Sequence, residues 1–269
     1  MCGKEGIMKY GFIGCGNMGG AIAKALRRQT ADIIIADPSP SAKAFAQSLG
    51  VSHTDNETLV SCCDRIFLAV KPQMMKGVLT PLQPLLAQKK PLLITMAAGL
   101  EIAQIQSFAG CNLPIIRIMP NTPVAVGKGM IQYCRNSLVS DDVLEDWLSD
   151  MQFCGRLDVL DEKLIDAAAA LSGAGPAFMY MFIEALADGA VACGIPRAKA
   201  YEYAAATMAG SAELVLTSGQ HPGTLKDAVC SPGGSTIAGV RALEQHGFRA
   251  AAMDCIIAAC QRNKELGKQ

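Results

Sequence analysis

The 269-residue sequence is poor in aromatic residues, has only three histidines and carries no excess of either charge. Its 24 basic residues balance its 24 acidic ones, so no net field attracts nucleic acid or an anionic membrane surface. His53, His221 and His246 have no Cys-x-x-Cys pair beside them, so we expect no metal site. The longest uncharged run, residues 167–183, contains glycines and a proline, which argues against a membrane span.

Cysteine, in contrast, is plentiful. The eleven cysteines are an odd number and show no disulfide pattern, and residues 1–7 are too short and too charged for a targeting peptide. We therefore expect a cytoplasmic protein whose thiols are mostly free and buried.

The chain divides into two halves with different patterns. β-rich runs alternate with helical ones up to about residue 160, whereas helical patterns rich in Ala and Met follow from Glu162. Near-continuous apolar strands separated by helices predict a parallel sheet that is covered on both faces. The expected strands are residues 8–13, 32–36, 65–70, 91–95, 115–118 and 130–134, and the expected helices are 17–28, 41–49, 73–87, 162–171, 177–193, 197–217, 236–244 and 250–264.

A glycine-rich loop, Gly-Cys-Gly-Asn-Met-Gly at residues 14–19, directly follows the first expected strand and opens a helix. In this context Gly14 permits a tight turn, Gly16 lets the backbone approach a pyrophosphate, and Gly19 lets helix and strand pack closely. The loop predicts a dinucleotide site with its phosphates at the helix N-terminus.

Two further strand ends bear on the cofactor. Asp37 ends the second strand and is placed to accept a hydrogen bond from a ribose 2′-hydroxyl, which favours NAD. The serines that follow offer hydroxyls to a 2′-phosphate, so the choice between NADH and NADPH stays open. Lys71 follows the strand at 65–70, where ligands bind in open α/β sheets, with Pro72 suited to the first position of a helix.

A second glycine-rich turn interrupts the helical half at residues 232–234. Ser235 and Thr236 are expected to cap the helix that follows. Backbone N–H groups at such a helix start form a seat for a carboxylate or phosphate. The hydroxyls of Ser231 and Thr236 flank this seat and are our candidate catalytic groups.

The motifs occur in a specific order along the chain. Gly-Phe-Ile-Gly-Cys-Gly-Asn-Met-Gly (11–19), Val-Lys-Pro-Gln (70–73), Met-Pro-Asn-Thr-Pro (119–123), Leu-Ser-Gly-Ala-Gly-Pro-Ala (171–177) and the segment 225–239 together resemble the pyrroline-5-carboxylate reductases. That family reduces L-1-pyrroline-5-carboxylate to L-proline with NADPH or NADH, the last step of proline biosynthesis. The resemblance covers almost the whole chain.

The resemblance implies a fold and a partner. It implies an α/β Rossmann-type doubly wound sheet that binds the dinucleotide in residues 1–160. An all-α domain for substrate binding and dimerisation follows in residues 161–269. The expected partners are a small-molecule substrate and further copies of the chain, in a dimer or a ring of dimers, with no nucleic acid and no membrane.

The resemblance also implies roles for individual residues. The expected cofactor-binding residues are Gly14, Cys15, Gly16, Asn17, Met18, Asn56, Val70, Lys71, Pro72 and Ala97. The expected substrate-binding residues are Glu162, Gly233, Gly234, Ser235 and Thr236. The chain departs from the family at Ala228, where some members carry an amide near the cofactor, and at Ser235, where threonine or alanine is common.

Reduction of the pyrroline-5-carboxylate imine requires no catalytic histidine, because the nitrogen of the substrate ring either enters protonated or receives a hydrogen bond from Thr236. Whether Thr236 donates a proton or only positions the ring stays open. Two other functions compete. One is a reductase for a different substrate on the same architecture. Such enzymes usually carry a lysine or aspartate for proton transfer on the interdomain helix, and the absence of lysine from residues 171–183 disfavours this function. The other is a dinucleotide sensor without catalysis.

Overall fold

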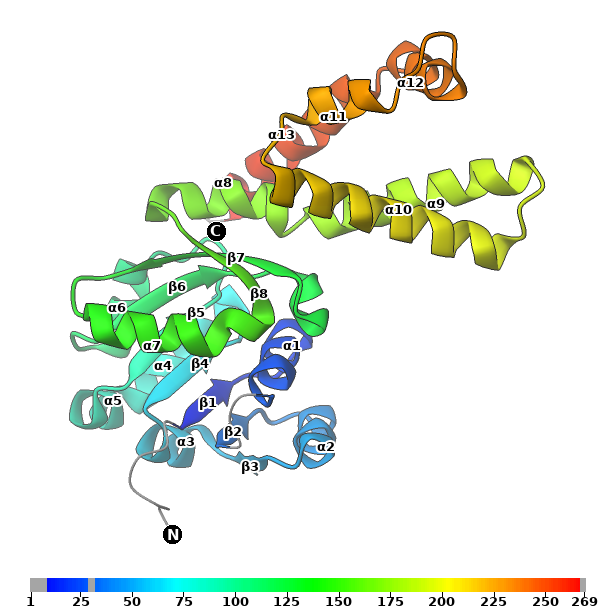
Figure 1. Cartoon of the computed structure of the whole chain (residues 1–269). Helices are drawn as coiled ribbons and strands as arrows, with labels where there is room; N and C mark the ends of the chain where they lie inside the picture. The colour runs from blue at the N-terminus through cyan, green and yellow to red at the C-terminus, as the bar shows by residue number, and fades with distance from the viewer. Residues whose placement is uncertain (1–8, 29–31, 267–269) are drawn as a thin grey trace. The chain divides into compact units, whose positions relative to one another are not determined.

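The structure, a computed structural model, describes residues 9–28 and 32–266 (Figure 1). These residues form two compact units. The first unit contains the described residues up to 174 together with residues 259–266, and the second contains residues 175–258.

Among the described residues of the first unit, eight strands form one sheet in the order β3-β2-β1-β4-β5-β6-β7-β8 (Figure 1). Neighbouring strands are parallel except β6 and β7. The expected parallel sheet therefore contains one antiparallel pair, because the connection 120–128 is too short for a crossover between parallel strands. The strands are β1 (Tyr10–Ile13), β2 (Ile33–Ala36), β3 (Ser52–Thr54), β4 (Arg65–Leu68), β5 (Leu92–Thr95), β6 (Ile115–Met119), β7 (Gly129–Arg135) and β8 (Gly155–Val159).

The central strands are buried on both faces because their side chains feed two separate cores. Ile13 and Leu68, paired in register on β1 and β4, belong to one core. Phe12 and Phe67, the preceding pair, belong to the other and stack with ring centroids 4.6 Å apart. Helices cover both faces, which gives the expected doubly wound arrangement.

Helices of the first unit divide between these cores. Side chains of α3, α4, α5, α6 and α8 enter the core that contains Ile13, and those of α1, α2 and α7 enter the other. The helices are α1 (Asn17–Leu26), α2 (Pro40–Leu49), α3 (Asn56–Cys62), α4 (Met75–Leu79), α5 (Gln83–Lys89), α6 (Ile102–Ala109), α7 (Asp141–Met151) and α8 (Glu162–Ser172).

The continuous helix expected over residues 73–87 is wrong. The chain forms η1 (Pro72–Met74), α4, η2 (Thr80–Leu82) and α5 instead. Pro81 and Pro84 explain the breaks, because proline has no N–H to donate and its ring clashes with the preceding turn.

A buried polar cluster fastens α7 to the sheet. Arg65 on β4 is 2% exposed, and its Nη1 donates to the Tyr10 hydroxyl and to Asp150 Oδ2 at 2.7 Å each. Asp150 also accepts from the Tyr10 hydroxyl. Burial is the main cause that raises the pKa of Tyr10 far above its ordinary value, so this hydroxyl remains a donor.

The second unit is helical throughout its described residues. It contains α9 (Gly175–Ala192), α10 (Arg197–Ser218), α11 (Pro222–Ala228), α12 (Ser235–Gln245) and most of α13 (Phe248–Leu266). Helices α9 and α10 lie side by side (Figure 1). Only three residues of the unit, Ala187, Ala200 and Ala204, are buried within the single chain.

The helices of this unit expose large apolar side chains, among them Met181 at 69% and Met253 at 60%. Such an apolar surface is typical of a face that packs against another protein or a membrane. The stretch Glu162–Ala192 is long and apolar enough to cross a membrane by length and composition, with an 18-residue window of mean hydropathy 1.2. It is two helices, however, because the chain turns at residues 173–174 between α8 and α9.

Candidate active site

The loop between β1 and α1 has the backbone that its glycines predict. Gly14 has φ +88°, and a Cβ there would lie 2.7 Å from the carbonyl oxygen of Ala69. A Cβ on Gly19 would lie 2.8 Å from the Cβ of Ala69. Both positions therefore exclude larger residues because a side chain would clash with Ala69. A Cβ on Gly16 would meet nothing within 4 Å. Gly16 therefore faces open space, as an approach site for a pyrophosphate requires.

The N-terminus of α1 is suited to an anion. Gly16 is the N-cap, so no side chain caps the helix, and its first turn contains no acidic residue. Gly16 and Asn17 are both exposed, whereas Met18 is half-buried. The positive end of the helix dipole thus remains available to a phosphate, and these residues fit a dinucleotide cofactor.

Asp37 connects the end of β2 with this loop. Its Oδ2 accepts a hydrogen bond from the Cys15 N–H at 2.7 Å. Its Oδ1 accepts from the Ser39 N–H at 2.8 Å and the Ser39 hydroxyl at 2.6 Å. Partial burial favours the neutral acid, but these hydrogen bonds outweigh it and hold the pKa of Asp37 below its ordinary value. Burial and the Asp37 charge raise the pKa of the Cys15 thiol to about 11.

Other expected cofactor residues lie at the same, carboxyl edge of the sheet, where parallel strands of such folds bind ligands. Val70 and Lys71 follow β4, and exposed Lys71 is the N-cap of η1, which begins at Pro72. Ala97 follows β5 and is 2% exposed. Asn56 follows β3 as the first residue of α3, and its neighbour Asp55 caps that helix.

Glu162 lies in a partly buried ionic cluster around Arg117 that the motifs do not reveal. Arg117 on β6 is 1% exposed, and its Nη2 lies 2.6 Å from Asp166 Oδ1 and its Nη1 3.5 Å from Glu162 Oε1. Asp166 Oδ1 also accepts from the Gly99 N–H at 3.3 Å, and Glu162 Oε1 accepts from the Ile102 N–H at 2.7 Å. The cluster fastens the first turns of α8 to the loop that follows β5, which carries Ala97. The only hint of this cluster in the sequence is a single arginine inside the apolar run of β6.

A second polar contact fixes the other end of α8. Asn121 is 8% exposed, and its Nδ2 donates to the carbonyl oxygen of Ser172 at 2.9 Å. Its Oδ1 accepts from the Met130 N–H at 2.9 Å, and the Ser172 hydroxyl donates to Gln132 Oε1 at 2.9 Å. The end of α8, immediately before the glycine-containing break, is thereby held to β7.

The turn between α11 and α12 corrects one expectation. Ser235 and Thr236 do not cap α12, because Gly234 already occupies the N-cap position with extended backbone and Ser235 is the first helical residue. Gly233 has φ +69°, and the Gly234 N–H donates to the Ser231 carbonyl at 3.0 Å. The side-chain hydroxyls of Ser235 and Thr236 are thus not used for capping. Ser231, Ser235 and Thr236 are all exposed, and the first turn of α12 has no acidic residue.

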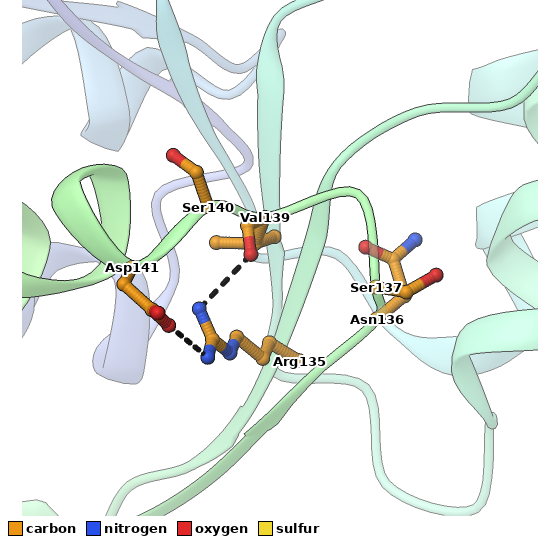
Figure 2. Close-up of a pocket in the computed structure, with 6 residues that line it drawn as sticks. All are labelled: Arg135, Asn136, Ser137, Val139, Ser140 and Asp141. Carbon is orange, nitrogen blue, oxygen red and sulfur yellow. Dashed lines mark hydrogen bonds and ion pairs between the residues drawn. The ribbon is translucent and has the colours of Figure 1, made fainter.

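A cavity of about 470 Å³ lies elsewhere, at the connection from β7 to α7. It is lined by Arg135, Asn136, Ser137, Val139, Ser140 and Asp141, none of which is an expected site residue (Figure 2). Arg135 donates to the Val139 carbonyl and forms an ion pair with Asp141. Because its charged groups already pair with each other, we assign no ligand to this cavity.

Comparison with known proteins bears on both parts of the chain. The family described as pyrroline-5-carboxylate reductase dimerisation matches residues 162–266, and the family described as NADP oxidoreductase, coenzyme F420-dependent, matches residues 9–99. The pyrroline-5-carboxylate reductase of Escherichia coli (strain K12) is 41% identical over 266 residues, covering 97% of this chain and 98% of that protein. The enzyme of Pisum sativum is 41% identical over 261 residues and covers 95% of each.

A solved structure agrees with these relatives. Plasmodium falciparum pyrroline carboxylate reductase with NADP bound superposes with a TM-score of 0.87 at 34% identity, over 97% of this chain and 98% of that one. The resemblance drawn from the ordered motifs is thereby confirmed, together with the Rossmann-type and helical halves. The chain belongs to the pyrroline-5-carboxylate reductase family of NAD(P)H-dependent oxidoreductases.

Proposed function

We propose that this chain reduces L-1-pyrroline-5-carboxylate to L-proline with NADPH or NADH, using the two glycine-rich helix starts as its anion sites. The observation that carries this proposal is that α1 and α12 both begin at a glycine N-cap without a side-chain cap or an acidic first turn. One helix start suits the cofactor's pyrophosphate and the other the substrate's carboxylate.

The cofactor occupies residues 1–160 in this proposal. Gly14, Cys15, Gly16, Asn17 and Met18 receive the phosphates. The strand-end residues Asn56, Val70, Lys71, Pro72 and Ala97 contact the remainder of the dinucleotide. The bound cofactor supplies a hydride to the imine carbon, while the protein orients the substrate and stabilises its charge.

The substrate binds to residues 161–269. The N–H groups of Gly233, Ser235 and Thr236 hold the carboxylate, which fixes the ring for hydride transfer. The Gly234 N–H is engaged with the Ser231 carbonyl, so Gly234 contributes to this seat as the N-cap of α12. The nitrogen of the substrate ring either enters already protonated, so that hydride addition alone gives the neutral amine, or takes a proton from the Thr236 hydroxyl, which regains one from solvent. Ser231 is the second candidate donor. Glu162 uses Oε1 for Arg117 and Ile102, and we assign its Oε2 to the substrate.

The test follows the loss of reduced-nicotinamide absorbance with L-1-pyrroline-5-carboxylate. We expect turnover by the wild type, and a kcat that is about ten- to a thousandfold lower for Thr236→Ala, the range for a lost positioned donor. Thr236→Ser keeps the hydroxyl and serves as the matched control. Wild-type kcat and KM in Thr236→Ala would exclude a catalytic role for Thr236. NADH binding without turnover in the wild type would support the sensor instead.

The family match and the exposed apolar helices support homo-oligomerisation. We propose further that dimers assemble into a ring in the cytoplasm, with the apolar faces of the second unit covered by other subunits and not by lipid. Sedimentation velocity on detergent-free protein tests this. We expect one species larger than a dimer, which Met181→Glu breaks up and the equally exposed Val126→Glu in the first unit does not. A wild-type species of dimer mass would contradict the ring.

A further inference from the structure

Asp37 presents a fixed negative charge at the cofactor edge of the sheet. A carboxylate has about four acceptor positions. Three are used here, by the Cys15 N–H, the Ser39 N–H and the Ser39 hydroxyl. These bonds hold the carboxylate beside the phosphate loop and leave about one acceptor position, on Oδ2.

The nearby serine hydroxyls, which would be the natural ligands of a 2′-phosphate, are already used. The Ser39 hydroxyl donates to Asp37, accepts from the Ala42 N–H as the cap of α2, and accepts from the Ser41 hydroxyl at 3.3 Å. The Nε2 of His53 lies 2.9 Å from the Asp37 carbonyl oxygen. That nitrogen is therefore engaged with the backbone, because a carbonyl oxygen only accepts.

NADH and NADPH differ only at the adenosine 2′ position, which lies at the end of the second strand in folds of this kind. The free position on Asp37 accepts a hydrogen bond from the ribose hydroxyl of NADH. A 2′-phosphate instead brings like charge against a carboxylate that three hydrogen bonds keep in place. Protonation gives no relief near neutral pH, because those bonds lower the pKa of Asp37.

We infer that Asp37 is a specificity-determining residue that makes NADH the preferred cofactor of this chain over NADPH. The inference rests on the dinucleotide site of the proposed function. It does not depend on the imine-reducing step.

The experiment measures dissociation constants of NADH and NADPH by fluorescence titration without substrate. We expect the wild type to bind NADH at least about tenfold more tightly than NADPH, because placing the 2′-phosphate of NADPH against the like charge of the Asp37 carboxylate is strongly unfavourable. Asp37→Asn keeps the size of the side chain and an acceptor for the Cys15 N–H but removes the charge. The NADPH-to-NADH ratio of dissociation constants should fall by about tenfold or more. The same ratio should also fall in Asp37→Ser. Circular dichroism checks that each variant is folded.

The matched control is Asp158→Asn, which removes an exposed charge from β8, the edge strand farthest from β2. It should leave the ratio unchanged. A wild type that binds NADPH as tightly as NADH overturns the inference, as does an unchanged ratio in both Asp37 variants. Selective NADH binding without reduction of pyrroline-5-carboxylate contradicts the proposed function and still supports the role of Asp37.

Discussion

Removing the Asp166 carboxylate should destabilise the first unit strongly. Arg117, 1% exposed, depends on Asp166 at 2.6 Å, and its Nε has no hydrogen-bond partner among the described residues. Breaking a buried ion pair from one side costs about 3–5 kcal/mol, because the remaining charge is left uncompensated. Glu162 remains 3.5 Å from Arg117, and the Asp166 side chain is 34% exposed, so we expect about 3 kcal/mol for Asp166→Ala.

Urea unfolding followed by Trp147 fluorescence measures this change. Trp147 is the only tryptophan of the chain, is fully buried in the first unit and packs edge-on against Tyr133. A loss of about 3 kcal/mol lowers the urea midpoint by about 1–3 M for typical dependences on denaturant. Glu145→Ala, an exposed carboxylate on α7, is the control and should stay within about 0.5 kcal/mol of the wild type.

A double variant separates the charge from the packing. Arg117→Met combined with Asp166→Leu leaves no buried guanidinium, so it should be more stable than Asp166→Ala alone. An Asp166→Ala midpoint equal to that of Glu145→Ala would refute the reasoning. So would a double variant less stable than the single one.

Two further predictions concern the glycine loop and the buried thiols. Gly16→Ala should preserve the thermal midpoint but weaken NADH binding by about tenfold, or about 1.4 kcal/mol, whereas Gly19→Ala should lower the midpoint because its Cβ would lie 2.8 Å from that of Ala69. Equal midpoints in the two variants, measured by thermal unfolding, would contradict this distinction. Burial raises the pKa of Cys63 and Cys154 from 9.0 to about 12, so the folded state keeps protons that the unfolded state loses above pH 9. The free energy of unfolding should therefore fall as pH rises from 9 to 12, by up to about 1.4 kcal/mol per pH unit for each thiol. The urea midpoint of Cys154→Ala should fall less steeply with pH than that of the wild type. Equal slopes of midpoint against pH would contradict this prediction.

The sequence predicts those elements whose signals are local. β1 is a continuous apolar run, and Gly14 and Gly19 mark the turn that follows it. β3 and β8 escape detection because they are short strands at the sheet edges whose positions are mainly exposed. The start of α12 is also local, but it depends on the extended backbone of Gly234, which the neighbouring hydroxyls of Ser235 and Thr236 do not disclose.

The ionic clusters of the first unit could not be predicted in the same way. Arg117 and Asp166 are 49 positions apart, and Arg65 and Asp150 are 85 apart. A charge inside an apolar strand shows that a partner must exist, since burying it alone is prohibitive. Only the folded chain shows which of the many acidic residues provides that partner.

The last helix, α13, returns the chain to the first unit. α13 begins in the second unit, but from residue 259 it belongs to the first, where Asn263 Nδ2 donates to the Asp166 carbonyl oxygen at 3.1 Å. In topological terms, residues 175–258 are a cassette inserted into the nucleotide-binding unit, with both joints fastened to the same helix, α8. A chimera that exchanges this cassette between relatives would therefore retain both attachment points, whereas a truncation before Asn263 would release one of them.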